Sequence, residues 1–205
     1  MAKEAKDNST EEKIKNAARR IFQQKGYAGT RTRDIAEEAG INLALLNYYF
    51  RSKERLFDLI MTESLEEFFR SLRSVFDDPS TDFEEKIRRI VENYIDKLTA
   101  NPNLPIFILS ELRNHPEELI KKTGVKKVFL NSVFIQQLED EIAAKRVKPI
   151  KSLHFIMNML GMTVFPFIAS PMIKGMGNID QTEFENLMQE RKTLIPVWIK
   201  MILTS

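Results

Sequence analysis

Side chains able to bind the phosphates and base edges of a nucleic acid are concentrated in a short stretch near the N-terminus. Arg31 and Arg33 suit phosphate groups by their charge. Asn42 and Asn47 add amides and Tyr48 a hydroxyl, groups that donate to phosphates or read base edges. This combination favours nucleic-acid recognition over catalysis.

Catalytic and metal chemistry find little support in the residue inventory. The 205-residue chain has two His and no Cys, which excludes disulfides, iron–sulfur clusters, thiolate zinc sites and cysteine nucleophiles. It has no His-x-x-x-His pair, Gly-rich phosphate loop or dinucleotide fingerprint. Adjacent carboxylates such as Glu37 and Glu38 point about 100° apart on a helix, so solvation explains them better than acid–base chemistry. We therefore expect no enzyme, no cofactor and no metal site.

The elements that carry the candidate residues are predicted to be helices. A first helix is expected to begin with the capping box Ser9–Glu12 and to end at Gly26. Two short helices within residues 32–39 and 42–50, separated by a turn at Gly40, form the pattern of a helix-turn-helix. The second helix of such a unit enters the DNA major groove. The alternative is a plain helical hairpin without function.

The rest of the chain is also predicted to be helical. A long helix is expected from Ser52 to Phe76, and a second capping box opens the next helix at residues 81–84. Further helices are predicted over residues 104–114, 116–123, 125–146, 149–170 and 180–203. The fold class is therefore all-α, with about nine helices, divided into an N-terminal three-helix domain of residues 1–52 and a helical body of residues 53–205.

The charge is distributed unevenly between these two parts. The formal net charge is only +2, which taken alone argues against nucleic-acid binding. Residues 1–56, however, hold 12 Lys+Arg against 8 Asp+Glu, a net of +4, and the remaining residues have a net of −2. The N-terminus is polar and has no apolar core of a signal peptide, so we expect a cytoplasmic protein.

Two runs of sequence around the predicted helix-turn-helix carry a specific motif. They are Gly26-Tyr-Ala-Gly-Thr-Arg-Thr-Arg-Asp-Ile-Ala-Glu-Glu-Ala-Gly-Ile41 and Leu46-Asn-Tyr-Tyr-Phe-Arg-Ser-Lys-Glu-Arg-Leu56. Together they closely resemble the DNA-binding domain of the TetR family of transcriptional regulators, over residues 10–60 almost without gaps. The resemblance implies an all-helical homodimer whose larger domain binds a small molecule. Most members are repressors that the ligand releases from DNA.

The resemblance also implies roles for individual residues. Thr32 stands where the family contacts phosphate at the start of the second helix, beside Arg31 and Arg33. Tyr48 matches a tyrosine that hydrogen-bonds phosphate. Lys53 matches a phosphate-binding lysine at the start of the long helix, where the positive helix end helps.

The chain departs from the family within the reading helix. Where the family commonly has Lys, Gly and Thr, this chain has Leu43, Ala44 and Leu45, and it has Asn47 and Tyr49 where Tyr and His are frequent. The missing lysine removes one phosphate or base contact. The apolar side chains suit thymine methyl groups, and Asn47 suits adenine. DNA binding is thus expected without a predicted operator sequence.

Candidates for the small-molecule site lie in the helical body. They are Phe107, Glu111, His115, Phe129, Phe134 and Met157. Methionines and aromatic rings suit an adaptable apolar cavity, although they suit an ordinary core equally well. The predicted effector is apolar or amphipathic, with Glu111, His115 and His154 as possible polar contacts.

The last two predicted helices are expected to form the dimer surface. Residues 152–173 contain no formal charge, and residues 184–202 carry a second apolar stripe, so two helices from each subunit would pair as a four-helix bundle. Pro166 and Pro196 should kink or interrupt these helices. A membrane span is the alternative for residues 152–173, since roughly 20 apolar residues cross a bilayer, but the stretch also holds two prolines and several polar residues.

The sequence therefore predicts a dimeric TetR-type repressor that binds a palindromic operator and is released by a small molecule. A helical small-molecule carrier or enzyme with a vestigial helix-turn-helix is the alternative, and the apolar run Leu43–Leu45 is its best support.

Overall fold

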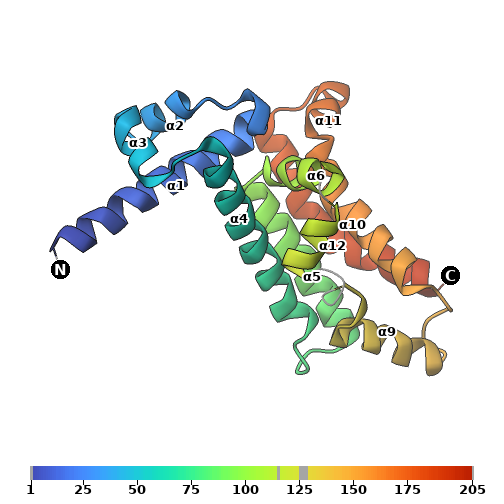
Figure 1. Ribbon diagram of the computed structural model, residues 1–205. Helices are drawn as coiled ribbons and strands as arrows, with labels where there is room; N and C mark the ends of the chain where they lie inside the picture. The colour runs from blue at the N-terminus through green and yellow to red at the C-terminus, as the bar shows by residue number, and fades with distance from the viewer. Residues whose placement is uncertain (1, 115, 125–128, 205) are drawn as a thin grey trace.

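Every regular element that the structure describes is an α-helix, as the sequence predicts (Figure 1). The computed structural model describes residues 2–114, 116–124 and 129–204. The helices are α1 (Ala2–Gly29), α2 (Thr32–Glu38), α3 (Leu43–Tyr49), α4 (Lys53–Phe76), α5 (Phe83–Ala100), α6 (Leu104–Asn114), α7 (Pro116–Thr123), α9 (Val133–Ala143), α10 (Ser152–Ile168), α11 (Ser170–Gly177) and α12 (Gln181–Thr204).

Helix α1 starts earlier than its capping box predicts. It begins at Ala2, so Ser9 lies inside the helix. The preceding residues include several Ala, Lys and Glu, which are strong helix formers and allow the helix to extend backwards. Gly26 interrupts the helical geometry as predicted, with φ 67°, a left-handed conformation that glycine adopts without steric cost.

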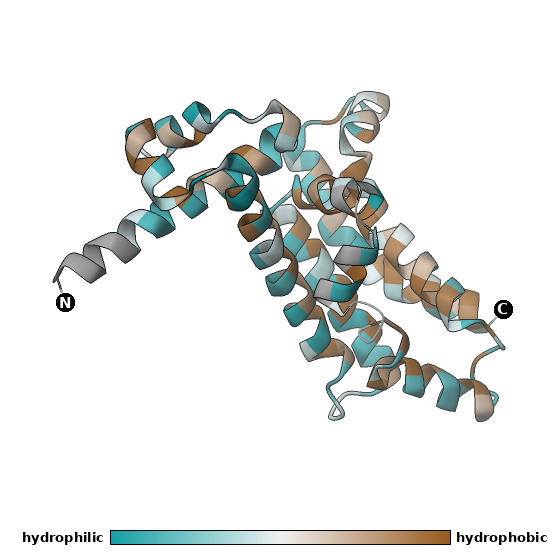
Figure 2. Cartoon of the chain, viewed as in Figure 1, coloured by the Kyte–Doolittle hydropathy of each residue, from teal (hydrophilic) through white to brown (hydrophobic). Residues whose placement is uncertain are grey.

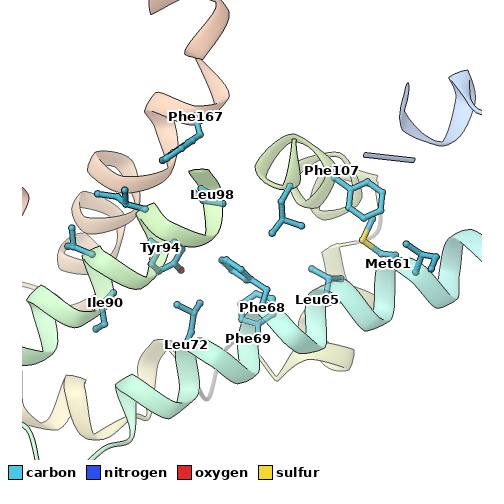
Figure 3. Close-up of a cluster of buried hydrophobic side chains, with 14 of the residues drawn as sticks. Met61, Leu65, Phe68, Phe69, Leu72, Ile90, Tyr94, Leu98, Phe107 and Phe167 are labelled. Atoms are coloured by element: carbon cyan, nitrogen blue, oxygen red, sulfur yellow. The ribbon is translucent and has the colours of Figure 1, made fainter. Parts of the chain in front are cut away.

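Helices α1–α3 form a head from which α4 runs into the body, where α5 lies against α4, α10 and α12 (Figure 1). Buried apolar side chains from α4, α5, α6 and α10 meet in the region drawn in Figure 3. Phe68 of α4 packs edge-on against Tyr94 of α5, with ring centroids 5.5 Å apart. Tyr94 is fully enclosed, and burial raises the pKa of its hydroxyl. The long α4 is thereby fixed to the body along its apolar stripe.

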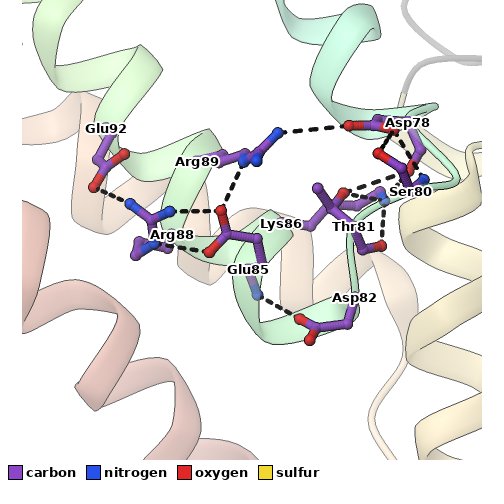
Figure 4. A network of polar contacts seen from close by, with 9 residues as sticks. All are labelled: Asp78, Ser80, Thr81, Asp82, Glu85, Lys86, Arg88, Arg89 and Glu92. Atoms are coloured by element: carbon purple, nitrogen blue, oxygen red, sulfur yellow. Dashed lines mark hydrogen bonds and ion pairs between the residues drawn. The ribbon is translucent and has the colours of Figure 1, made fainter.

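A buried lysine closes the turn between α4 and α5 (Figure 4). Lys86 is fully buried, and its ammonium donates hydrogen bonds to the Asp78 carbonyl and to both the carbonyl (3.0 Å) and hydroxyl (2.8 Å) oxygens of Thr81. Gln137 of α9 donates to the same Thr81 carbonyl at 2.7 Å. Burial lowers the pKa of Lys86. Buried polar groups thus contribute to holding this turn.

The C-terminal third differs from its predicted boundaries. The prediction of a single helix over residues 125–146 is wrong in its described part, because residues 131–132 are not helical. The Ser132 hydroxyl instead caps α9 by accepting a hydrogen bond from the Ile135 N–H. Residues 125–128 lie outside the described residues. Neither Pro166 nor Pro196 interrupts its helix; the chain instead bends by 70° between α10 and α11.

Exposed apolar side chains gather on α10, α11 and α12. Figure 2 shows apolar residues recurring along α10 and α12. Those exposed by more than half are Leu153, Met157, Phe165, Met172, Met176, Val197 and Met201. In the described ranges no single helix is long and apolar enough to cross a membrane. Helices α10 and α11, which are bent relative to each other, reach the length and apolar composition of a membrane span only when they are taken together.

Candidate nucleic-acid interface

The turn between α2 and α3 has the geometry of a helix-turn-helix. Gly40 adopts φ 67°, and the Ile41 N–H donates to the Ala36 carbonyl at 3.0 Å, which folds the chain back after α2. Ile35 and Ala36 from α2 and Leu46 from α3 are buried together with α1. These contacts fix the opposite face of α3 toward the outside.

The start of α2 is held by Asp34. Its carboxylate accepts a hydrogen bond of 2.9 Å from the Lys25 ammonium and one of 3.2 Å from the Arg31 N–H. The Lys25 hydrogen bond, followed by that of the Arg31 backbone, lowers the pKa of Asp34. Arg31 and Arg33 have exposed side chains, and Thr32 is half-buried, so the predicted phosphate contacts lie at one edge of the head.

Helix α3 divides its predicted contact residues into two groups. Leu43, Ala44, Asn47 and Tyr48 are exposed, and Tyr48 most of all, at 76%. Leu45 and Tyr49 are half-buried, and Tyr49 packs against the core.

Asn42 lies just before α3 and caps the helix. Its side-chain oxygen accepts from the Leu45 N–H at 2.8 Å. The amide oxygen of Asn42 therefore has a structural role, whereas Asn47 is an exposed residue within the helix.

Lys53 lies at the first position of α4 and faces the end of α1. Its ammonium donates to the Tyr27 carbonyl at 2.9 Å and to the Thr30 carbonyl at 3.0 Å. It also lies 4.1 Å from the centroid of the Tyr27 ring. The structure thus gives the predicted phosphate-binding lysine an additional role, that of joining α4 to the turn before α2.

Two further groups position the head and were not singled out in the sequence. Glu63 of α4 pairs with Lys15 at 2.7 Å and with Arg19 at 3.2 Å, both from α1. The hydrogen bond that the Lys15 ammonium donates to the Glu63 carboxylate is the main cause that raises the pKa of Lys15. Tyr27 packs edge-on against Phe57 of α4, with centroids 4.9 Å apart. An aromatic residue directly after Gly26 indicates that a ring packs at the end of α1. No local pattern in the sequence predicts that Glu63 forms ion pairs with α1.

The predicted small-molecule residues do not converge on one site. Phe107 is buried against Phe57, while Phe129 and Phe134 contact Phe76 at the other end of α4. These two ends of α4 are separated by about 28 Å at 1.5 Å per residue. Met157 is 55% exposed on α10. Glu111 lies in α6 without a described side chain, and His115 lies outside the described residues. His154 is exposed near the start of α10.

Within the described ranges, no group of three or more His, Asp or Glu side chains is arranged to hold a metal ion.

The head and its exposed α3 define a helix-turn-helix transcriptional regulator. Residues 14–60 match the sequence profile of bacterial regulatory proteins of the tetR family. The head thus carries the DNA-binding domain of the TetR family, and the helix-turn-helix of that domain is α2–α3.

Individual relatives agree with this assignment. Over 164 residues the chain is 24% identical to the "Probable HTH-type transcriptional regulator YttP" of Bacillus subtilis (strain 168), covering 78% of each protein. It is 32% identical over 120 residues to the HTH-type transcriptional regulator RutR of Escherichia coli (strain K12), covering 58% of this chain and 55% of RutR. The crystal structure of the transcriptional regulator FadR from Bacillus subtilis in complex with stearoyl-CoA has the same fold, with a TM-score of 0.61 and 20% identity over 89% of this chain and 95% of that one.

Proposed function

We propose that this chain is a dimeric repressor that binds a palindromic operator in the cytoplasm and is released by an apolar or amphipathic small molecule. The observation that carries the proposal is the link between the head and α4, which Lys53 makes through the end of α1 and the turn before α2. The outward side chains of α3 belong to a head that Lys53 joins directly to the first turn of α4. Any movement of α4 is therefore transmitted to the DNA-reading surface.

The proposed dimer forms through α10 and α12. Leu153, Met157 and Phe165 follow one face of α10, and Val197 and Met201 follow α12, all more than half exposed in the single chain. Pairing these faces across a two-fold axis would bury them in a four-helix bundle. The two heads would then meet successive major grooves about one helical turn apart.

The proposed effector site lies among α4, α5, α6 and α10, in the apolar region of Figure 3. The hydroxyls of Ser64 and Thr99, on α4 and α5, are buried and have no hydrogen-bond partner among the described residues. A polar group of an effector would satisfy such atoms, while its apolar part would contact Phe68 and Phe107. FadR, bound to stearoyl-CoA in its crystal structure, supports an amphipathic effector for this fold.

Release would follow from a change in head spacing. Phe57 of α4 touches Tyr27 of α1 and Phe107 of α6, with centroids 4.9 and 5.6 Å away, so displacement of α6 acts on both helices. An effector shifts the equilibrium only by the difference in its affinity for the two spacings. Equal head separation in the free and effector-bound dimers would therefore contradict this mechanism.

Selection of bound duplexes from a random pool, followed by titration, tests the proposal. We expect a palindromic site that binds two chains, and release of the duplex when stearoyl-CoA or stearate is added. Selection of no consensus would count against a repressor. A consensus that neither compound releases would leave DNA recognition intact and overturn the amphipathic effector.

A further inference from the structure

The outward face of α3 is narrow and has a defined chemistry. Leu43, Ala44, Asn47 and Tyr48 are exposed, and their spacing of one, four and five residues places them on one side of the helix. Leu46, on the opposite side, is fully buried. A duplex facing α3 therefore meets two aliphatic side chains, one amide and one phenol.

This face lacks the groups that recognise guanine and cytosine. Bidentate contact with the O6 and N7 atoms of guanine comes from Arg or Lys, and contact with the cytosine amino group comes from Asp or Glu. None of these four residue types occurs in the seven residues of α3. Exposed cations flank α3 in the sequence, Arg33 on α2 and Arg51 after α3, and both lie outside the helix that would enter the groove.

The same face suits adenine and thymine. An asparagine amide pairs in a bidentate manner with the N6 and N7 atoms of adenine, and aliphatic side chains contact the thymine methyl group. Asn47 provides the exposed amide, because the side-chain oxygen of Asn42 is already occupied by the Leu45 N–H. Leu43, 37% exposed, and Ala44 provide the aliphatic surface.

We infer that α3 selects A·T base pairs at the centre of each half-site, with Asn47 on adenine and with Leu43 and Ala44 on thymine methyl groups. This inference rests on the proposed function, because it requires α3 to lie in the major groove. The specificity comes from two kinds of contact. The DNA group that makes each contact can be removed without changing Watson–Crick pairing.

The test uses the palindrome selected from a random pool, with matched replacements in both half-sites. Replacing thymine by uracil removes only the methyl group, and replacing adenine by 7-deazaadenine removes only N7. We expect uracil to weaken binding of the unmodified protein by about fourfold per contacted methyl, and 7-deazaadenine to weaken it by about fivefold or more. Leu43→Ala should reduce the sensitivity to uracil and leave the part that comes from Ala44, and Asn47→Ala should remove the sensitivity to 7-deazaadenine.

Matched controls separate local from general effects. Leu109→Ala on α6 and Asn103→Ala before α6 change exposed residues of the same types outside the head, and both should keep the two sensitivities. Thermal unfolding should show that Leu43→Ala and Asn47→Ala remain folded, because both side chains are exposed.

The outcomes distinguish this inference from the function on which it rests. Tight, salt-dependent binding to a site with G·C pairs at the centre of each half-site, insensitive to both base analogues, would overturn the A·T inference and leave the repressor intact. Absence of salt-dependent binding to any duplex would overturn the proposed function itself.

Discussion

The ammonium of Lys53 lies 4.1 Å from the centroid of the Tyr27 ring and donates a hydrogen bond of 2.9 Å to the Tyr27 carbonyl. Its second hydrogen bond, to Thr30, leaves one of its three N–H groups for another acceptor. One residue at the first turn of α4 thus stabilises the end of α1 and keeps one donor for a further acceptor.

Substituting Lys53 tests both roles. Lys53→Ala should lower the free energy of unfolding by about 1 kcal/mol, because two carbonyl groups lose a charged donor in a half-buried position. It should also weaken binding to all duplexes and reduce the slope of log K against log salt concentration by about one unit. Urea unfolding and titrations at several salt concentrations measure the two effects. A loss of stability with an unchanged slope would mean that Lys53 acts only inside the protein.

Leu43→Lys should increase the salt dependence of DNA binding, whereas Lys53→Ala should reduce it. The Leu43→Lys substitution places a cation on the exposed face of α3, where the TetR family commonly has a lysine, and should increase the slope of log K against log salt by about one unit. Fluorescence anisotropy with the selected duplex measures this slope. Because Leu43 is partly exposed, the melting temperature should stay the same. An unchanged slope would indicate that this position does not face DNA.

The head should lose a stabilising contact in acid. Since the pKa of Asp34 is lowered in the folded protein, its contribution to stability is present above the ordinary pKa of 3.8 and is lost as the pH falls through the lower, folded value. Asp34→Asn should therefore reduce the melting temperature at pH 7, and the difference should shrink progressively as the pH is lowered below 3.8. The melting temperatures of both proteins across this range test the expectation. A difference that stays the same across this range would contradict it.

Lys86→Met should destabilise the body without affecting α3. The substitution keeps most of the apolar stem but removes the donor from the Asp78 and Thr81 carbonyls, at a cost of about 2 kcal/mol. Chemical unfolding measures the loss, and Lys13→Met, which changes an exposed lysine on α1, is the control. Equal effects of the two substitutions would show that the buried hydrogen bonds contribute little.

Local signals in the sequence were sufficient to predict the helix-turn-helix. Gly40 predicts the turn, Asn42 and Ser52 predict the starts of α3 and α4, and the structure confirms all three. Each of these predictions depends on residues within one helical turn of one another.

The contacts that position the head could not be predicted in the same way. Lys53 reaches backbone carbonyls more than twenty residues away, and a carbonyl acceptor leaves no trace in residue type. The pairing of Glu63 with Lys15 likewise depends on how α4 crosses α1. The prediction of one helix over residues 125–146 was wrong for a different reason. The apolar pattern continues across residues 131–132, although Ser132 caps the start of a separate helix, α9.

The most direct test of the central claim, that α3 and the basic residues around it bind duplex DNA, is an anisotropy titration of the selected palindrome at 50 and 200 mM salt. We predict binding of two chains per duplex, with an affinity that falls steeply between the two salt concentrations as counterions are released. Undetectable or salt-independent binding would contradict the claim and favour a helical small-molecule carrier or enzyme whose helix-turn-helix is vestigial.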